Sequence, residues 1–425
     1  MTARAFLDGL FRTAIAAAHP STCLPPHLPP PPRSGHLIVL AAGKAAGAMT
    51  EVVEAAYVGL PPARLIGVAV VRQGYGRPTR IIPMIEAGHP IPNAAGLDAA
   101  NRALTLAAGA GPDDLVLVLL SGGASANWIA PVDGVTLADK QAVTRALLRS
   151  GANIGEINMV RKHLSRIKGG RLALRAQPAR VVTLAISDVP GDDPAVIGSG
   201  PTVPDPSTLA DARDVVARYR LELPEAVTRA LADPMNETPK PGDKLFAAAE
   251  FKLVARPADA FHAATSVVRA NGYEPVLLGD RIEGEARQVA AEHAALALAL
   301  RAQGRRAVVL SGGELTVTIR GRGRGGPNQE YALALALALK DASGITALSA
   351  DTDGTDGGVG SPNDPAGAII DESTLSRAQR LGLDPAAFLA DNDSTAFFSR
   401  LGDLVETGPT CTNVNDFRAI VVDRP

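Results

Sequence analysis

The stretch LVLVLLSGGASANW, Leu115 to Trp128, decides how this chain is expected to fold. An unbroken apolar run comes first, and Ser-Gly-Gly follows it directly. A continuously apolar run is typical of a parallel strand that helices cover on both faces. Because open α/β sheets bind ligands beyond the carboxyl ends of their strands, the glycine turn is also the first candidate for a binding loop.

Segments of strand and helix type alternate outward from this stretch. HLIVLAAG, IGVAVV, PMIEAG and RVVTLAIS resemble the first apolar run, and helices are expected over 44–57, 93–108, 136–150 and 154–164. This alternation predicts an α/β fold with a doubly wound, Rossmann-like sheet in the N-terminal half. The pattern restarts with FKLVA behind ADPMNETPKPGDK, so we predict two domains, 1–240 and 241–425, the second of mixed α/β type. In the second half, LTVTIR alternates apolar and polar residues, which favours an antiparallel strand with one exposed face.

Composition narrows the classes of partner. The chain has 425 residues, 46% of them apolar, and a net charge of -2 without a basic stripe, so no nucleic-acid partner is expected. No apolar run reaches the ~18 residues that span a bilayer, so no membrane partner is expected either. Two cysteines without a C-x-x-C pair favour a cytoplasmic protein with neither a disulfide framework nor a zinc site. The first twenty residues predict an amphipathic helix.

In the N-terminal half, polar loops follow four strand-type segments. Lys44 stands just after LIVLAAG, where a cation suits a phosphate oxygen, although a surface lysine fits the position equally well. In the turn after LVLVLL, two adjacent glycines let amides converge on an anion, the alternative being a turn without a ligand. Carboxylates after VVTLAIS suit Mg²⁺, the alternative being solvated turn aspartates. The candidates from these loops, from GSGPT and from the end of a basic helix are Lys44, Ser121, Gly122, Gly123, Ala124, Ser125, Lys168, Ser199, Asp188 and Asp193.

The C-terminal half repeats this arrangement. Glu314 follows AVVLSGG, Asp353 follows ITALSA, and Asn413 and Asn415 lie in a polar loop near the end of the sequence. GRGRGG, residues 321–326, formally matches a dinucleotide-binding pattern, but it follows an alternating segment where a buried parallel strand would be needed. We therefore expect its amides and its arginines, among them Arg324, to face a charged ligand. The next residue, Pro327, suits the first position of a helix.

Taken in order, these loops resemble the class II glycerate 2-kinases, whose C-terminal half is the MOFRL domain. The matching segments span nearly the whole chain: AAGKAA, EAGHPIPN, LSGGASA, NMVRKHLSRIKGGRLA, ISDVPGDDPAVIGSGPTVPD, GDRIEGEAR, SGGELTVTIRGRGRGGPNQE, SADTDGTDG, NDSTAFF and TGPTCTNVND. The resemblance implies ATP- and Mg²⁺-dependent phosphorylation of the 2-hydroxyl of D-glycerate, at an active site in the cleft between two α/β domains. It assigns catalytic roles to Lys44, Glu314 and Asp353, and binding roles to Asn413 and Asn415. Two positions depart from the family pattern: Pro327 stands where an arginine is common, and Cys411 where a glycine is usual.

Phosphoryl transfer needs alignment and charge neutralisation more than covalent help. We expect Lys44 to stabilise the transferring phosphoryl group and the amides of 121–124 to hold a phosphate or the glycerate carboxylate. Asp188, with Asp193, is expected to hold Mg²⁺, and Asp353 or Glu314 to orient the hydroxyl and accept its proton. The partners expected are D-glycerate and a nucleotide, and a homodimer is left open.

Two other functions compete with the kinase. Members of the resembling family are also named hydroxypyruvate reductases, which makes an NAD(P)H-dependent reductase the first alternative, with GRGRGG as its nucleotide loop. A non-catalytic binder of small anions is the second alternative. Turnover of ATP with D-glycerate, compared with NADH oxidation by hydroxypyruvate, separates the three.

Overall fold

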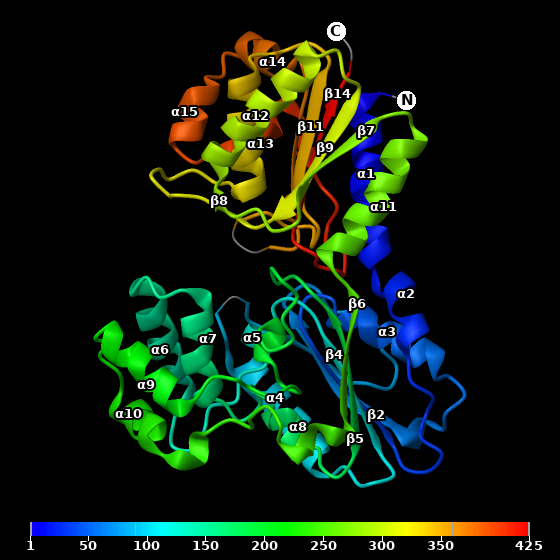
Figure 1. The fold of residues 1–425 in the computed structure, drawn as a ribbon, viewed down its shortest axis with the longest axis vertical. Coiled ribbons are helices and arrows are strands. Elements are labelled where there is room, and N and C mark those ends of the chain that lie inside the picture. The colour runs from blue at the N-terminus through cyan, green and yellow to red at the C-terminus, as the bar shows by residue number, and fades with distance from the viewer. Residues whose placement is uncertain (1, 90, 359–360, 424–425) are drawn as a thin grey trace. The chain divides into compact units, whose positions relative to one another are not determined.

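The chain divides into two units, which are described separately. The computed structural model describes residues 2–89, 91–358 and 361–423. The N-terminal unit is Cys23–Val254, and the C-terminal unit combines Met1–Thr22 with Ala255–Pro425 (Figure 1). The sequence-based boundary at residue 240 falls inside the N-terminal unit, and the first helix, assigned from sequence to the N-terminal domain, lies in the C-terminal unit.

The N-terminal unit is built on a six-stranded sheet in the order β3-β2-β1-β4-β5-β6. Neighbouring strands from β3 to β5 are parallel, as their continuous apolar sequences predict. The strands are β1 (Leu37–Ala42), β2 (Leu65–Arg72), β3 (Met84–Ala87), β4 (Leu115–Leu120), β5 (Arg180–Ile186) and β6 (Ala249–Ala255). Strand β6 contains the FKLVA segment, so this segment completes the first sheet and does not open the second domain.

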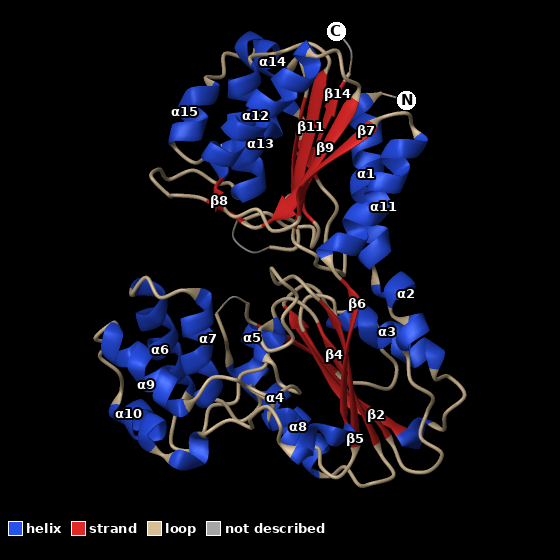
Figure 2. Cartoon of the chain, in the orientation of Figure 1, coloured by secondary structure: helices blue, strands red, loops and turns tan. Residues whose placement is uncertain are grey.

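Helices cover both faces of this sheet (Figure 2). Ile38 and Leu40 of β1 belong to the same apolar core as Ala99 and Ala103 of α4, while the alternate side chains of β1 face the other way. The helices are α3 (Ala46–Ala56), α4 (Ala94–Ala108), α5 (Ala124–Asn127), α6 (Leu137–Arg149), α7 (Ile154–His163), α8 (Arg171–Arg175), α9 (Leu209–Arg218) and α10 (Glu225–Ala232), with α2 (Pro20–Cys23) at the boundary of the unit. Thr136 and Thr208 begin α6 and α9 with capping boxes, so local sequence sets where these helices start.

The C-terminal unit contains a mixed six-stranded sheet in the order β13-β12-β11-β14-β9-β7. Its strands are β7 (Glu274–Gly279), β9 (Ala307–Gly313), β11 (Ile345–Asp351), β12 (Gly367–Ile370), β13 (Leu404–Val405) and β14 (Asp416–Val422). A separate parallel pair joins β8 (Gly284–Glu285) to β10 (Leu315–Thr316). The antiparallel strand expected over LTVTIR is therefore wrong, because only its first two residues pair, and they pair in parallel.

Helices lie on both faces of this second sheet as well (Figure 1). One face carries α12 (Ala286–Ala302) and α13 (Pro327–Leu339), whose apolar residues share a core with Val309 and Ile420. On the other face, the rings of Phe11 in α1 (Ala3–Ala18) and Phe261 in α11 (Pro257–Ala270) both lie against Phe417 of β14. The remaining helices are α14 (Thr374–Arg380), α15 (Pro385–Ala390) and α16 (Ser394–Leu401). In the described part of the chain, no helix combines the length and the apolar character that a membrane span requires.

Candidate active site

The strand order of the N-terminal unit places a topological switch point between β1 and β4. From β1 the chain continues to β2 and β3 on one side, and β4 and β5 lie on the other side. Such a point is where open α/β sheets bind ligands. The loops after β1 and β4 meet there: the Lys44 amide donates to the Gly122 carbonyl at 2.8 Å, and the Ala45 amide to Ser121 Oγ at 2.9 Å.

Glycine allows these two loops to approach each other. At Gly43, with φ of 118°, a Cβ would lie 2.4 Å from Ser121 Oγ, a distance that no side chain could tolerate. At Gly123, with φ of 83°, a Cβ would lie 3.1 Å from the His89 ring and 3.5 Å from Lys44 Cγ. Lys44 and His89 therefore both border the Ser-Gly-Gly turn. From sequence alone, His89 is more typical of a structural histidine, although its position just after β3 (Met84–Ala87) already places it at the same sheet edge.

Ser125 is the centre of a second group of candidates. Its hydroxyl lies 2.8 Å from Ser199 Oγ, and Lys168 Nζ donates to its carbonyl at 2.7 Å. Arg161 also donates to that carbonyl, at 3.2 Å. The structure thus brings three of the predicted residues together, with Lys168 and Ser199 each in contact with Ser125. Arg161 is not among the residues predicted from sequence, because the segment 158–173 carries six basic residues and its sequence does not show which of them are buried.

Lys168 and Arg161 are the two cations beside the Ser125 carbonyl. Within residues 2–89, 91–358 and 361–423, neither Lys168 nor Arg161 has a carboxylate within ion-pair distance. Burial lowers the pKa of Lys168 well below its ordinary value, and the positive charges of Arg161, Lys140 and Lys162 lower it further. Burial also lowers the pKa of Arg161, whose Nε is buried without an acceptor among the described atoms. Because burial disfavours the charged forms of both groups, a bound anion would stabilise them at this point.

The loop after β5 carries the aspartates predicted to hold a metal ion. Asp188 follows the strand and is half-buried, and Asp193 Oδ1 accepts the Ala195 amide at 2.8 Å. Asp192 adopts a φ of 57°, and its Oδ1 is buried without a donor among the described residues. No cluster of three or more metal-type side chains occurs in the described part of the chain. Since Mg²⁺ is often held by one or two carboxylates together with phosphates and water, the orphaned oxygen of Asp192 fits such an ion.

In the C-terminal unit, the predicted residues lie close together at one end of the central strands of the second sheet. Strands β9 and β11 both pair antiparallel with β14, and both Gly313 and Asp351 lie opposite Asp416. Glu314 and Asp353 therefore leave the sheet beside the start of β14, where Asn413 and Asn415 lie. The Thr410 amide donates to the Asp353 carbonyl at 3.2 Å, which ties the two loops together.

Asp353 and Asn415 are held in defined positions. Asp353 is buried, and its Oδ1 accepts the Thr355 amide at 2.8 Å. Asn415 adopts a φ of 63°, and its Nδ2 is buried without an acceptor among the described residues. Such a donor suits an oxygen atom of a ligand. Cys411 also lies at a positive φ, of 61°, a conformation that the glycine usual at this position adopts without strain.

The GRGRGG loop has a different role from the one predicted. Its Arg322 and Arg324 amides donate to the Asp391 and Asp393 side chains, at 2.9 Å and 3.0 Å, and the Gly323 amide donates to the Asp391 carbonyl at 2.9 Å. The expectation that these amides face a ligand is therefore wrong, because the chain itself occupies them. The Arg324 side chain is still accessible, 60% exposed and 3.4 Å from Asp364.

Comparisons with known proteins show which family the chain belongs to. The family model described as a domain of unknown function, DUF4147, matches residues 6–232, and the MOFRL family model matches residues 307–416. A protein of Agrobacterium vitis named putative hydroxypyruvate reductase is 48% identical over 99% of this chain and 95% of its own length. The D-glycerate 2-kinase of Thermotoga maritima is 39% identical over 89% of each chain. A crystal structure of glycerate kinase from Thermotoga maritima superposes with a TM-score of 0.87, at 37% identity, covering 98% of this chain and 99% of that one.

Proposed function

The chain belongs to the glycerate kinase family, and from this premise we propose that it phosphorylates the 2-hydroxyl of D-glycerate with ATP and Mg²⁺, giving 2-phosphoglycerate. The family is one of kinases that transfer a phosphoryl group from a nucleotide to an alcohol. The observation that carries the proposal is the meeting of Lys44, His89 and the Ser-Gly-Gly turn at the β1/β4 switch point.

In the proposed reaction, Lys44 stabilises the charge on the transferring phosphoryl group. The Ser-Gly-Gly turn would hold phosphate oxygens with the amides of Gly122 and Gly123, because the expected donors Ser121 and Ala124 donate their amides to the carbonyls of Ala42 and Ser121. Lys168 and Arg161 would supply positive charge behind Ser125. Ser199 and Ser125 add hydroxyl donors to the same anion site.

The proposed metal site is in the loop after β5. Asp188 would hold the ion together with the orphaned carboxylate oxygen of Asp192, and Asp193 would contribute the oxygen that does not accept the Ala195 amide. A bound Mg²⁺ would supply charge neutralisation on the phosphate oxygens.

The C-terminal unit would supply the groups that orient the acceptor hydroxyl. Asp353 or Glu314 accepts the proton as the bond to phosphorus forms, and Asn415 Nδ2 donates to a substrate oxygen, with Asn413 beside it. Arg324 replaces the arginine that is common at the position of Pro327, which here begins α13. A cytoplasmic location and a homodimer remain predictions.

Two enzyme assays test the proposal. We expect ADP formation from ATP, Mg²⁺ and D-glycerate, and a loss on the order of 10³-fold in kcat/KM for Lys44→Ala. Lys244→Ala, at an exposed position of the same unit, is the control and is expected to keep wild-type turnover. Near-wild-type turnover of a folded Lys44→Ala enzyme would contradict the role of the lysine.

One observation favours a second candidate. The 48% identical Agrobacterium vitis relative is named a putative hydroxypyruvate reductase. Against this function, GRGRGG is the segment with a dinucleotide pattern, and its amides bind the Asp391–Asp393 loop. If the protein oxidises NADH with hydroxypyruvate and does not turn over ATP, the proposed function is wrong and the protein is a reductase. Inactivity in both assays would favour a non-catalytic binder of small anions.

A further inference from the structure

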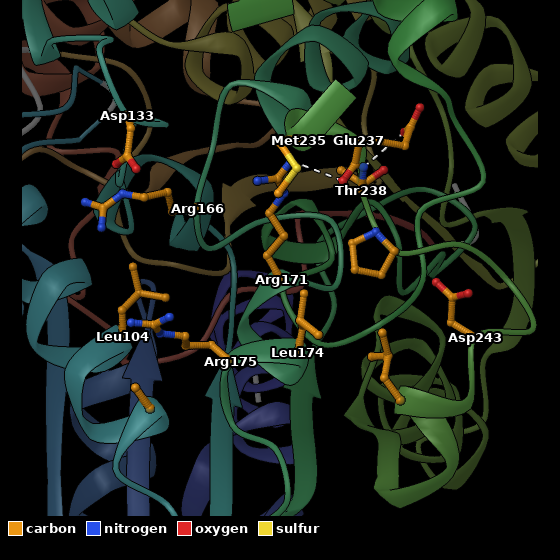
Figure 3. Close-up of a pocket in the computed structure, with 13 residues that line it drawn as sticks. Leu104, Asp133, Arg166, Arg171, Leu174, Arg175, Met235, Glu237, Thr238 and Asp243 are labelled. Carbon is orange, nitrogen blue, oxygen red and sulfur yellow. Dashed lines mark hydrogen bonds between the residues drawn. The ribbon is translucent and has the colours of Figure 1, made fainter. Parts of the chain in front are cut away.

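A cavity of about 730 Å³ lies in the N-terminal unit, apart from the loops described above (Figure 3). Three arginines line it, Arg166, Arg171 and Arg175, and we call it the arginine pocket. Leu104 and Ala108 of the last turns of α4 also line it. The last turn of α4 precedes the start of β4, whereas the Ser-Gly-Gly turn follows the end of β4. The wall that α4 forms therefore lies toward the amino ends of the parallel strands, about one strand length from the switch point.

None of the three guanidinium groups has an ion-pair partner within the described ranges of the chain. Arg166 uses Nε and Nη2 to donate to the Pro131 carbonyl and to Asn101 Oδ1, both at 2.8 Å. Arg171 donates through Nη2 to the Asn236 carbonyl at 2.6 Å, and its Nε is buried without an acceptor among the described residues. Burial lowers the pKa of Arg171, because the more distant carboxylates only partly offset the loss of water around this cation.

The acidic side chains of the pocket are largely engaged elsewhere. Glu237 lies 2.6 Å from Lys240 and 3.1 Å from His163, and despite desolvation by burial these bonds lower its pKa to about 2. Asp243 accepts the Lys240 amide at 2.6 Å. The third acid, Asp133, is exposed. The guanidinium groups of the pocket therefore keep positive charge that no carboxylate of the described residues neutralises at contact distance.

We propose that the arginine pocket binds a small organic molecule with clustered negative charge, a phosphate ester or a polycarboxylate. Arginine presents a planar fork of donors that matches the oxygens of both groups, and it keeps its charge at every physiological pH. The cavity has the volume of a metabolite site, and the exposed Asp133 can accept hydrogen bonds from hydroxyl groups of the same ligand.

The pocket is joined to the candidate active site through a short segment. Lys168, which holds Ser125, and Arg171, which lines the pocket, are separated only by Gly169 and Gly170. These glycine amides donate to the carbonyls of Ser199 at 3.0 Å and Gly200 at 2.7 Å. A ligand that binds Arg171 and shifts it therefore also shifts the segment that positions Lys168 and Ser199. We infer from this coupling, which rests on the proposed function, that the ligand regulates the kinase.

Calorimetric titration tests the binding without using activity. The full chain, saturated with a non-hydrolysable ATP analogue so that phosphate positions of the active site are occupied, is titrated with glucose 6-phosphate and separately with citrate. We expect one of the two probes to bind at one site, and binding to weaken by about tenfold or more in Arg175→Ala. Arg175 is the variant of choice because it is exposed and makes no hydrogen bond or ion pair within the described ranges, so folding does not depend on it.

The control is Arg149→Ala. Arg149 is an exposed arginine in the last turn of α6, so this substitution removes the same charge from the same unit. It is expected to bind the probe as the wild type does. Absence of binding by both probes, or equal affinity of the wild type and Arg175→Ala, would overturn the site. For the coupling, the bound probe is expected to change KM or kcat in the wild type and to lose this effect in Arg175→Ala; unchanged kinetics at saturation would contradict it.

Discussion

Gly123 decides how closely the Ser-Gly-Gly turn can approach Lys44 and His89. The residue has φ of 83°, and the place of its missing side chain is bordered by both of these neighbours. Gly134 has nearly the same φ, 80°, but a Cβ added there would have no other atom within 4 Å. The two glycines therefore have nearly the same φ and differ in what surrounds the place of the missing side chain.

Alanine at these two positions separates backbone strain from crowding at the site. We expect Gly123→Ala and Gly134→Ala each to lower the free energy of unfolding by about 1–2 kcal/mol, the cost of a left-handed non-glycine residue. Only Gly123→Ala should also lower kcat/KM, by about tenfold or more, because its methyl group displaces His89 or Lys44. Urea unfolding and steady-state kinetics measure the two effects, and equal activity of both variants would argue against a tight site around Gly123.

Site residues could be predicted from sequence where the residue types of a loop indicate ligand binding. Lys44 and the Ser-Gly-Gly turn were recognisable because glycines and a cation directly follow apolar strands. Arg161 and Asp192 were not selected, because what distinguishes them is one buried polar atom each, Nε and Oδ1, without a hydrogen-bond partner among the described residues. That property depends on atoms contributed by segments far away in the sequence.

At the scale of elements, α12 and α13 are joined by a buried polar contact. His293 of α12 lies 2.8 Å from the Tyr331 hydroxyl of α13, beside an apolar core, and the buried guanidinium of Arg418 lies 5.8 Å from the centre of the Tyr331 ring. Burial, aided by the positive charge of Arg418, lowers the pKa of His293 from 6.5 to about 4. The folded chain therefore keeps this imidazole neutral at pH values where the unfolded chain protonates it.

This difference predicts the acid sensitivity of the helix pair. The stability that neutral His293 contributes is complete above pH 6.5 and is lost as the pH falls toward 4, a loss of about 3 kcal/mol. His293→Gln, which cannot titrate, should flatten the fall in unfolding free energy over that pH range. His262→Gln, at an exposed histidine of the same unit, should follow the wild-type curve. Parallel curves for all three proteins would show that His293 does not titrate as expected.

The segment LTVTIRGRGRGG shows where a local pattern misleads. Its alternation is that of a strand, yet the amides from Arg320 onward bind the Asp391–Asp393 loop instead of a neighbouring strand. The glycines fit this contact, because a Cβ at Gly321 or Gly323 would lie 2.2 Å from atoms of Asp391 or Asp393. The partner of Arg322 stands 69 positions later in the chain, so periodicity could not reveal it.

At the scale of the whole molecule, the main difficulty was to decide which core each element joins. The alternation of apolar runs correctly predicted a parallel sheet followed by a mixed α/β unit. The first helix and strand β6 each join the unit opposite to the one expected, since an amphipathic face specifies burial but not the partner that buries it. Both segments lie next to the points where the chain passes from one unit to the other, where sequence neighbours give the least guidance.

The placement of the first helix yields a prediction about stability. Phe11 of α1 is fully buried against Phe417, so Phe11→Ala should destabilise the C-terminal unit by about 3–5 kcal/mol. Hydrogen exchange should accelerate in 255–423 and stay unchanged in the N-terminal unit, although the substitution lies near the start of the sequence. Arg12→Ala, at the exposed neighbour, is the control. Faster exchange confined to 23–254 would contradict the assignment of the helix.

The contact between Phe11 and Phe417 has a consequence for how the protein is made. A ribosome adds about 5–20 residues per second, so the first helix waits on the order of 20–80 s until β14 exists. During that time the apolar face of the helix lacks the strand that buries it in the folded chain. The helix is therefore made before the N-terminal unit, but it joins its own core only after β14 has been made.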